Sequence, residues 1–259
     1  MKKLLLFCFI LLAYSSLVNG QESKIKLLAS PDTSLYYKPL EIEASGFEPG
    51  QQVTIAVNAI DSEGNNWTSS AVFVTNNFGI VNPTQSESVS GSYTGVRPMG
   101  LFWSMKSIDD HQIATVRGYT ATINIRVNDS TVASKSLYRR STRELDQLNI
   151  TGTEIRDSII ANYYLPQSEK RLPAIIFLGG SGGQFRQERS SLFASEGFAV
   201  LNLKYFKFNG LPDGITEIPL EYVAKAHEWL KNQPEIDTTR IGIMGRSMGS
   251  QLALLCLLQ

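Results

Sequence analysis

The sequence predicts a two-part fold, an antiparallel β-sandwich followed by a parallel β-sheet that is covered by helices. Between residues 24 and 140, apolar side chains recur at every second position in short runs, which is the period of half-buried strands. From residue 150 onward, continuous apolar runs alternate with segments of helical period, the pattern of a parallel sheet with helices on its faces. The change falls in the polar stretch 141–153, so we predict domains at 24–145 and 150–259.

The strands of the first domain are predicted from alternation and from turns. Alternation is clearest at residues 40–45, 53–58 and 123–128, and clusters of Gly, Pro, Asn or Asp lie at 46–50, 61–66, 76–79 and 128–130. Such clusters mark turns. Short strands separated by turns at this spacing are typical of an antiparallel β-sandwich.

In the second domain, strands are expected at residues 159–165, 174–178, 199–206 and 241–244, and helices at 188–196, 220–232 and 251–258. Because the strand segments are almost continuously apolar, each is expected to be buried within the sheet. Arg139, Arg140 and Arg143, near the domain boundary, are interpreted as a solvated linker, with phosphate contacts as the alternative.

The composition excludes several classes of protein. The 259 residues are 42% hydrophobic and 19% charged, with 24 Lys and Arg against 24 Asp and Glu. These values are ordinary for a globular chain and exclude disordered, collagen-like and multi-span membrane proteins. The balanced charge gives no reason to expect nucleic acid as a partner. The only cysteines, Cys8 and Cys256, cannot form a disulfide framework.

Residues 1–20 predict a secretory signal peptide. Lys2 and Lys3 precede an apolar run at 4–13, and a polar segment begins after Gly20, as in signals that are cleaved. A membrane anchor is the alternative, but it needs roughly 20 apolar residues. We therefore expect an exported protein, periplasmic or secreted, with no stable membrane insertion once the signal is removed.

A pentapeptide in the second domain carries the candidate chemistry. Residues 245–249 read G-R-S-M-G, directly after an apolar strand and before an apolar helix. In α/β-hydrolases this pattern forms a sharp turn that exposes the serine hydroxyl, and glycines avoid collisions two residues away on either side. Ser247 is therefore the candidate nucleophile. The backbone N–H of Met248, at the helix N-terminus, is a candidate donor to an oxyanion.

A glycine-rich loop at residues 179–183 follows the strand predicted at 174–178. The corresponding loop of α/β-hydrolases supplies another oxyanion donor, which makes the N–H groups of Gly180 and Ser181 candidates. A phosphate-binding loop is the alternative, but the Lys-Ser/Thr of a P-loop and the spacing of a dinucleotide fingerprint are both missing. No cofactor and no metal ion is implied, because acyl transfer of this kind uses side chains and backbone donors.

The sequence around these motifs resembles a known family. EGFA at 196–199, LKYF at 203–206 and IPLEY at 218–222 separate the loop from the pentapeptide, and WTSSA at 67–71 and GVRPMGLFWSM at 95–105 lie in the first half. In this order they resemble acyl-CoA thioesterases and bile acid-CoA:amino acid N-acyltransferases, over nearly all of the chain beyond the signal.

The resemblance implies an immunoglobulin-like β-sandwich followed by an α/β-hydrolase domain. It also implies a nucleophile that takes an acyl group from a thioester or ester and passes it to water or an amine. Ser247 matches the nucleophile position, which is Ser in the thioesterases and Cys in the bile acid transferases, so hydrolysis is favoured.

The catalytic triad is incomplete in this sequence. In this fold an acid and a histidine follow the serine, but residues 248–259 contain no Asp, Glu or His. His111 belongs to the first domain and His227 precedes Ser247, so neither fits the role of base. We therefore expect a partial, C-terminally truncated hydrolase domain, with its last strand as an open edge, and no activity of these 259 residues alone.

Three functions remain open. The first is an acyl-CoA thioester hydrolase or acyl-CoA:amino acid N-acyltransferase of fatty acid metabolism that works through an acyl-serine, with a small acyl thioester or ester as substrate. The second is an exported carboxylesterase or peptidase, because acyl-CoA is intracellular whereas the signal predicts export. The third is a non-catalytic binding protein that uses the β-sandwich.

Overall fold

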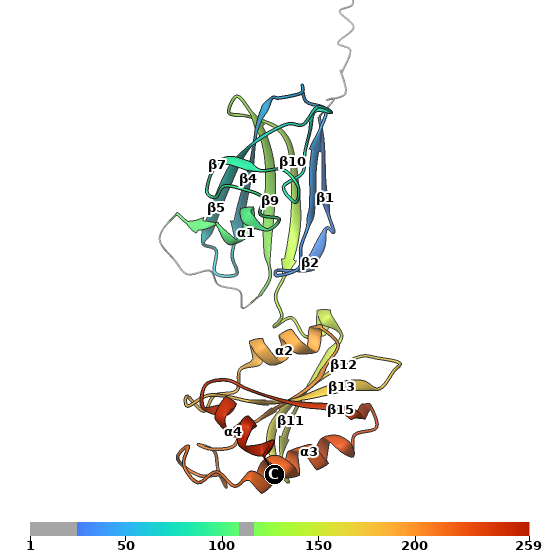
Figure 1. The fold of residues 1–259 in the computed structure, drawn as a ribbon, viewed down its shortest axis with the longest axis vertical. Helices are drawn as coiled ribbons and strands as arrows, with labels where there is room; N and C mark the ends of the chain where they lie inside the picture. The colour runs from blue at the N-terminus through green and yellow to red at the C-terminus, as the bar shows by residue number, and fades with distance from the viewer. Residues whose placement is uncertain (1–24, 109–116, 259) are drawn as a thin grey trace, which may run out of the picture.

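The computed structural model describes residues 25–108 and 117–258 (Figure 1). The predicted signal peptide, residues 1–20, and His111 lie outside these ranges. Within them, two sheets form the first half of the chain and a third sheet forms the second half. None of the described helices is both long and apolar enough to cross a membrane.

The first half contains a small and a large β-sheet. The small sheet has the order β1 (Lys26–Ser30), β3 (Glu41–Ser45) and β6 (Ile80–Val81). The large sheet has the order β2 (Thr33–Leu35), β10 (Ser130–Arg140), β9 (Tyr119–Val127), β4 (Gln52–Ile60), β5 (Asn66–Val74) and β7 (Ser88–Gly91), with β8 (Lys106–Ser107) paired to β5. All these pairs are antiparallel except β2 and β10.

The two sheets share one apolar core. Ile42 of the small sheet and Ile55, Ile123 and Ile125 of the large sheet are buried and belong to the same cluster. Because alternate residues of a strand face opposite sides of its sheet, the predicted alternation at these positions is confirmed. The short helix α1 (Gly100–Trp103) also packs against this core. The immunoglobulin-like type of this two-sheet domain stays a prediction.

The second half is built on a five-stranded sheet with helices on its faces (Figure 1). The strand order is β11 (Ile150–Arg156), β12 (Ile160–Pro166), β14 (Ala199–Leu203), β13 (Leu172–Leu178) and β15 (Ile236–Gly245). The helices are η1 (Asp146–Leu148), α2 (Gln187–Ser195), α3 (Leu220–Lys231) and α4 (Met248–Cys256).

The prediction of a parallel sheet is confirmed for three of the five strands and is wrong for the other two. Strands β13, β14 and β15 are parallel, whereas β12 is antiparallel to both β11 and β14. Strand β11 was missed because it lies at the sheet edge and residues 151–154 are exposed, which removes the apolar pattern. The strand predicted at 199–206 ends at Leu203, and the helix predicted at 251–258 begins at Met248.

Strand β15 was predicted to be buried, and this is also wrong. In the described sheet β15 pairs only with β13. Gly242 is exposed and Met244 is 38% exposed, because one side of the strand has no neighbour there. The strand therefore supports the serine turn from an edge position, as the expectation of an open edge stated.

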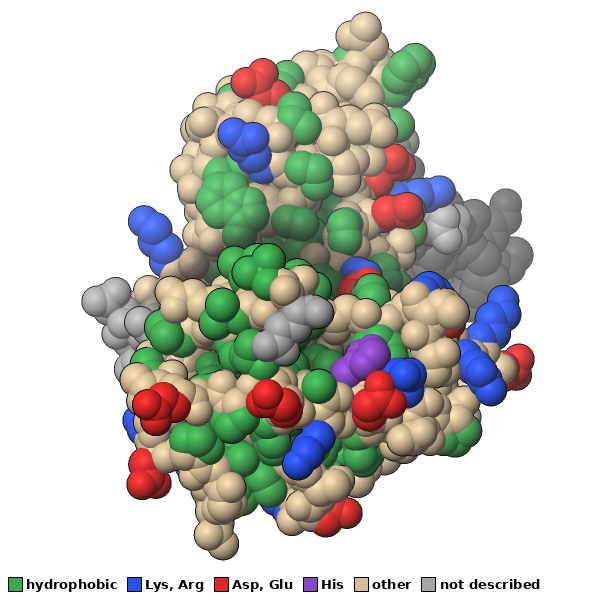
Figure 2. Space-filling view, turned by 60° about the horizontal axis from the view of Figure 1, so that its bottom comes forward, with side chains coloured by type: hydrophobic (Ala, Val, Ile, Leu, Met, Phe, Trp, Pro, Cys, Tyr) green, Lys and Arg blue, Asp and Glu red, His purple; other side chains and the backbone are tan. Residues whose placement is uncertain are grey.

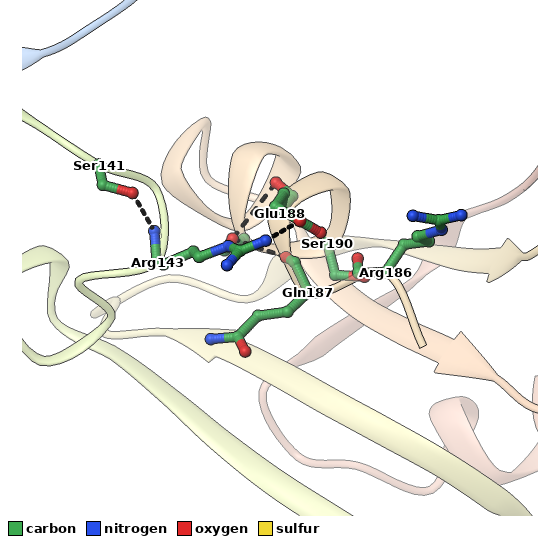
Figure 3. Close-up of polar contacts among 7 residues, drawn as sticks. Ser141, Arg143, Arg186, Gln187, Glu188 and Ser190 are labelled. Carbon is green, nitrogen blue, oxygen red and sulfur yellow. Dashed lines mark hydrogen bonds and ion pairs between the residues drawn. The ribbon is translucent and has the colours of Figure 1, made fainter. Parts of the chain in front are cut away.

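Polar side chains connect the two halves at α2. The Tyr37 hydroxyl donates a hydrogen bond to Glu196 Oε1 at 2.5 Å, and Lys38 Nζ lies 2.6 Å from the same carboxylate. In the first turn of α2, Glu188 pairs with Arg143 (Figure 3). The hydrogen bonds from Lys38 and Tyr37 hold the pKa of Glu196 below its usual value. Segments near residues 37 and 143 thus contact the helix that follows the glycine-rich loop.

Candidate active site

Ser247 occupies a strained turn between β15 and α4. Its backbone has φ 54° and ψ −124°. Residues other than glycine rarely adopt a positive φ of this kind. The residue is exposed and stands at the N-cap of α4, yet its side chain makes no capping hydrogen bond. Serine is among the most effective capping residues, so the turn leaves the Oγ atom unengaged.

Close backbone contacts explain both glycines of the pentapeptide. A Cβ atom on Gly245 would lie 2.1 Å from the carbonyl oxygen of Gly249. A Cβ atom on Gly249 would lie 2.4 Å from the carbonyl oxygens of Leu178 and Gly179. The predicted need to avoid collisions at these positions is confirmed. The contact with the end of β13 is a further reason that the sequence pattern did not reveal.

The glycine-rich loop lies beside Ser247. A Cβ atom on Gly180 would lie 3.2 Å from the Cβ and 3.8 Å from the Oγ of Ser247. The Tyr205 hydroxyl, two residues beyond the end of β14, donates a 2.6 Å hydrogen bond to the Gly179 carbonyl and so supports the loop. Burial raises the pKa of the Tyr205 hydroxyl, which keeps it protonated as the donor.

The loop and the serine turn enclose a pocket of about 240 Å³. Its lining residues are Gly180, Ser181, Gly182, Gly183, Gln184, Arg186, Arg246 and Ser247. The structure therefore brings together three of the four predicted site residues. Met248 adjoins Ser247 in the chain but is not among the residues that line this pocket. The sequence analysis did not identify Arg186 and Arg246 as residues of this pocket. The only indication in the sequence was that each is a charged residue within or close to one of the two glycine motifs.

The predicted oxyanion donors have no hydrogen-bond partner among the described residues. Within residues 25–108 and 117–258, the N–H groups of Gly180, Ser181 and Met248 donate to no acceptor. Met248 is the first residue of α4, where helix N–H groups have no partner within the helix. Free N–H groups around a serine hydroxyl suit an oxygen that develops negative charge.

The described histidine lies at another site. His227 Nδ1 is 3.6 Å from a carboxylate oxygen of Glu228. The side chain lines a separate, largely apolar pocket of about 380 Å³ with Ile241 and Cys256, and this pocket shares no lining residue with that of Ser247. Figure 2 shows the hydrophobic side chains that gather on the face where this histidine lies. In the part of the chain that the structure describes, no group of three potential metal ligands is present.

A strand, a serine turn with positive φ, a helix and a neighbouring glycine-rich loop together define a domain of α/β-hydrolase type. Residues 37–151 match the acyl-CoA thioester hydrolase/BAAT N-terminal region, and residues 218–257 match the BAAT/acyl-CoA thioester hydrolase C-terminal region. The chain belongs to the acyl-CoA thioester hydrolase/BAAT family, which is a family of enzymes.

Two mouse relatives represent the two activities named in this family. The chain is 34% identical over 241 residues to acyl-coenzyme A amino acid N-acyltransferase 1 of Mus musculus, an alignment that covers 89% of this chain and 58% of the relative. It is 28% identical over 227 residues to acyl-coenzyme A thioesterase 6 of Mus musculus, covering 85% and 54%. The chain thus spans somewhat more than half the length of these relatives.

Among solved structures, esterase Est22 is similar to part of this chain. The two are 23% identical, the match covers 44% of this chain and 43% of the esterase, and the TM-score is 0.34.

Proposed function

We propose that the protein is an acyl-CoA thioester hydrolase or acyltransferase whose nucleophile is Ser247. The observation that carries the proposal is the pocket in which an unengaged serine hydroxyl at positive φ lies beside free N–H groups of the glycine-rich loop. In this scheme residues 24–145 form an immunoglobulin-like sandwich domain and residues 150–259 supply the hydrolase site. A serine nucleophile favours water over an amine as the acyl acceptor, and fatty acyl thioesters are the proposed substrates.

The chemistry assigns one role to each group. Ser247 Oγ attacks the acyl carbonyl carbon, the N–H groups of Gly180, Ser181 and Met248 stabilise the resulting oxyanion, and the carbon–sulfur bond breaks to release the thiol. The serine proton must pass to a general base. Residues 248–259 contain no Asp, Glu or His, so we propose that these 259 residues by themselves form an acyl-serine slowly and do not turn over.

The first test is covalent labelling of residues 21–259 with an activated acyl thioester, followed by mass spectrometry of the peptide that contains Ser247. We expect one acyl group on Ser247, and none after Ser247→Ala, because Ser247, unlike Ser181 in the same pocket, stands at positive φ at the N-terminus of α4. Ser158→Ala, which changes an exposed serine in another turn, is the matched control and should label normally.

The labelling test can contradict either the assignment of Ser247 as the nucleophile or the proposed lack of turnover. An acyl group that persists in Ser247→Ala, or no acylation at all, would contradict the assignment of the nucleophile and favour a binding role for the sandwich. Catalytic turnover by residues 21–259 that disappears in Ser247→Ala would instead contradict only the proposed inactivity. A residual rate of about 10³-fold over water would not count as turnover, because incomplete triads retain such rates.

An exported carboxylesterase or peptidase is the second candidate, and the predicted signal peptide at residues 1–20 favours it. We propose that the protein is exported and that its mature N-terminus is Gln21. Mass spectrometry of the product in the extracytoplasmic fraction would show this mass, whereas a product that retains Met1 in the cytoplasm would contradict export. Labelling by a simple p-nitrophenyl ester but not by a long-chain acyl-CoA would favour the esterase.

A further inference from the structure

Two arginines stand at the Ser247 pocket without an anionic partner. Arg186 is the N-cap residue of α2, three residues after the glycine-rich loop, and Arg246 directly precedes Ser247. Both residues line the pocket. No Asp or Glu is among the lining residues. The site therefore concentrates positive charge where a substrate would meet the serine.

The side chains of these two arginines are not already engaged by carboxylates of the protein, as those of Arg143 and Arg240 are. Arg143 pairs with Glu188 and Arg240 pairs with Asp237. In the described ranges, the guanidinium groups of Arg186 and Arg246 form no hydrogen bond and no ion pair. Figure 3 shows the Arg186 side chain pointing away from the Arg143–Glu188 pair, with no contact drawn to its guanidinium.

Further cations lie over the ring of Phe185, two residues after the glycine-rich loop. Lys204 forms no ion pair among the described residues, and its ammonium group lies 5.4 Å from the centre of the Phe185 ring and 5.9 Å from that of Phe208. Burial lowers the pKa of Lys204, and the charges of Lys207 and Arg156 lower it further. Because like charges raise the free energy of the unliganded site, the whole region favours an anion.

We propose that Arg186 and Arg246 form a binding site for an anionic oxygen group, a phosphate or a carboxylate, next to the acyl-serine. The proposal rests on the proposed function, because the group would belong to a reactant of that chemistry. Guanidinium groups suit this task, since their planar N–H pairs match two oxygens of one phosphate or carboxylate. The two sources with this chemistry are the phosphates of a CoA leaving group and the carboxylate of an amino acid acceptor.

The test measures equilibrium binding by calorimetry to residues 21–259, in low salt, for four probes. Coenzyme A is compared with pantetheine, which lacks the phosphates, and the anion N-acetylglycine is compared with its neutral amide, which lacks the carboxylate. We expect at least one anionic probe to bind more tightly than its neutral partner. Arg186→Gln and Arg246→Gln should each weaken that binding about tenfold, as the loss of a charge-assisted hydrogen bond does. Added salt should weaken it as well.

Arg189→Gln is the matched control, because Arg189 is an exposed arginine on α2, one turn from Arg186, and does not line the pocket. A difference confined to coenzyme A identifies the phosphates of the leaving group as the source, and one confined to N-acetylglycine identifies the carboxylate of the acceptor. Equal binding of charged and neutral probes, or equal effects of Arg186→Gln and Arg189→Gln, would overturn the proposal.

The binding test is independent of the labelling test. Binding that depends on Arg186 and Arg246 while Ser247 is not acylated would retain the anion site and reject the proposed function. Acylation of Ser247 without binding that depends on Arg186 and Arg246 would retain the proposed function and reject the anion site.

Discussion

Replacement of Gly245 by alanine is expected to lower the free energy of unfolding by about 3 kcal/mol, at the upper end of overpacking substitutions. The added Cβ atom would lie 2.1 Å from the carbonyl oxygen of Gly249 and 2.3 Å from the amide nitrogen of Ser250. Both are backbone atoms of the first turn of α4. Since no side-chain rotation can relieve these contacts, α4 must move away from β15 and the serine turn must open.

Urea unfolding of residues 21–259, followed by circular dichroism, measures this change. Gly242→Ala is the matched control, because Gly242 lies on the same strand and a Cβ atom there has nothing within 4 Å. If the two substitutions lowered stability equally, general strand effects would account for the loss and the contact with α4 would not. In the labelling test, Gly245→Ala should also reduce acylation of Ser247 because the turn no longer holds its geometry.

Arg139→Met is expected to destabilise the protein by about 3 kcal/mol, because three acceptors lose a charged donor. Arg139 is fully buried, and its Nη2 donates hydrogen bonds to the carbonyls of Tyr36 at 2.9 Å and Lys38 at 2.6 Å. Nη1 donates to the hydroxyl of Ser34, and the guanidinium lies 5.2 Å from the centre of the Phe102 ring. Methionine fills similar space but leaves these acceptors without a donor.

The substitution Arg139→Met should also weaken the hydrogen bonds that join the first half of the chain to Glu196 in the second half. Tyr37 and Lys38, within the segment that Arg139 holds, contact Glu196 after α2. Arg126→Met on β9 is the matched control, because Arg126 is only partly buried and its guanidinium has no hydrogen bond within the described residues. Denaturant unfolding midpoints of the two variants give the comparison. A loss in Arg139→Met no larger than in Arg126→Met would contradict the proposed role of the buried network.

Local patterns in the sequence located the elements of the second half apart from η1 and β11, but only β3, β4 and β9 of the first half. The alternation at Ile42, Ile55 and Ile123 correctly identified the strand faces that form the core. Helix α3 was predicted within one residue, because its apolar residues recur at helical spacing. Exposed residues 151–154 hid β11, since an edge strand needs no regular apolar pattern. The arginine cluster was interpreted as solvated, and for Arg139 this is wrong.

The sequence by itself determined the local geometry of the candidate site. A glycine two residues on each side of Ser247, between an apolar strand and an apolar helix, was enough to predict a sharp turn with an exposed hydroxyl. Such patterns can be recognised because the interactions that produce them join residues close together in the chain.

Only the tertiary structure decided which distant residues meet at Ser247. Strand β13 lies beside β15, and this pairing places the carbonyl of Gly179 against Gly249 and Gly180 beside Ser247. The same pairing brings Arg186 into one pocket with Arg246. Strand order depends on packing among the whole sheet and its helices, and no local period of the sequence encodes it.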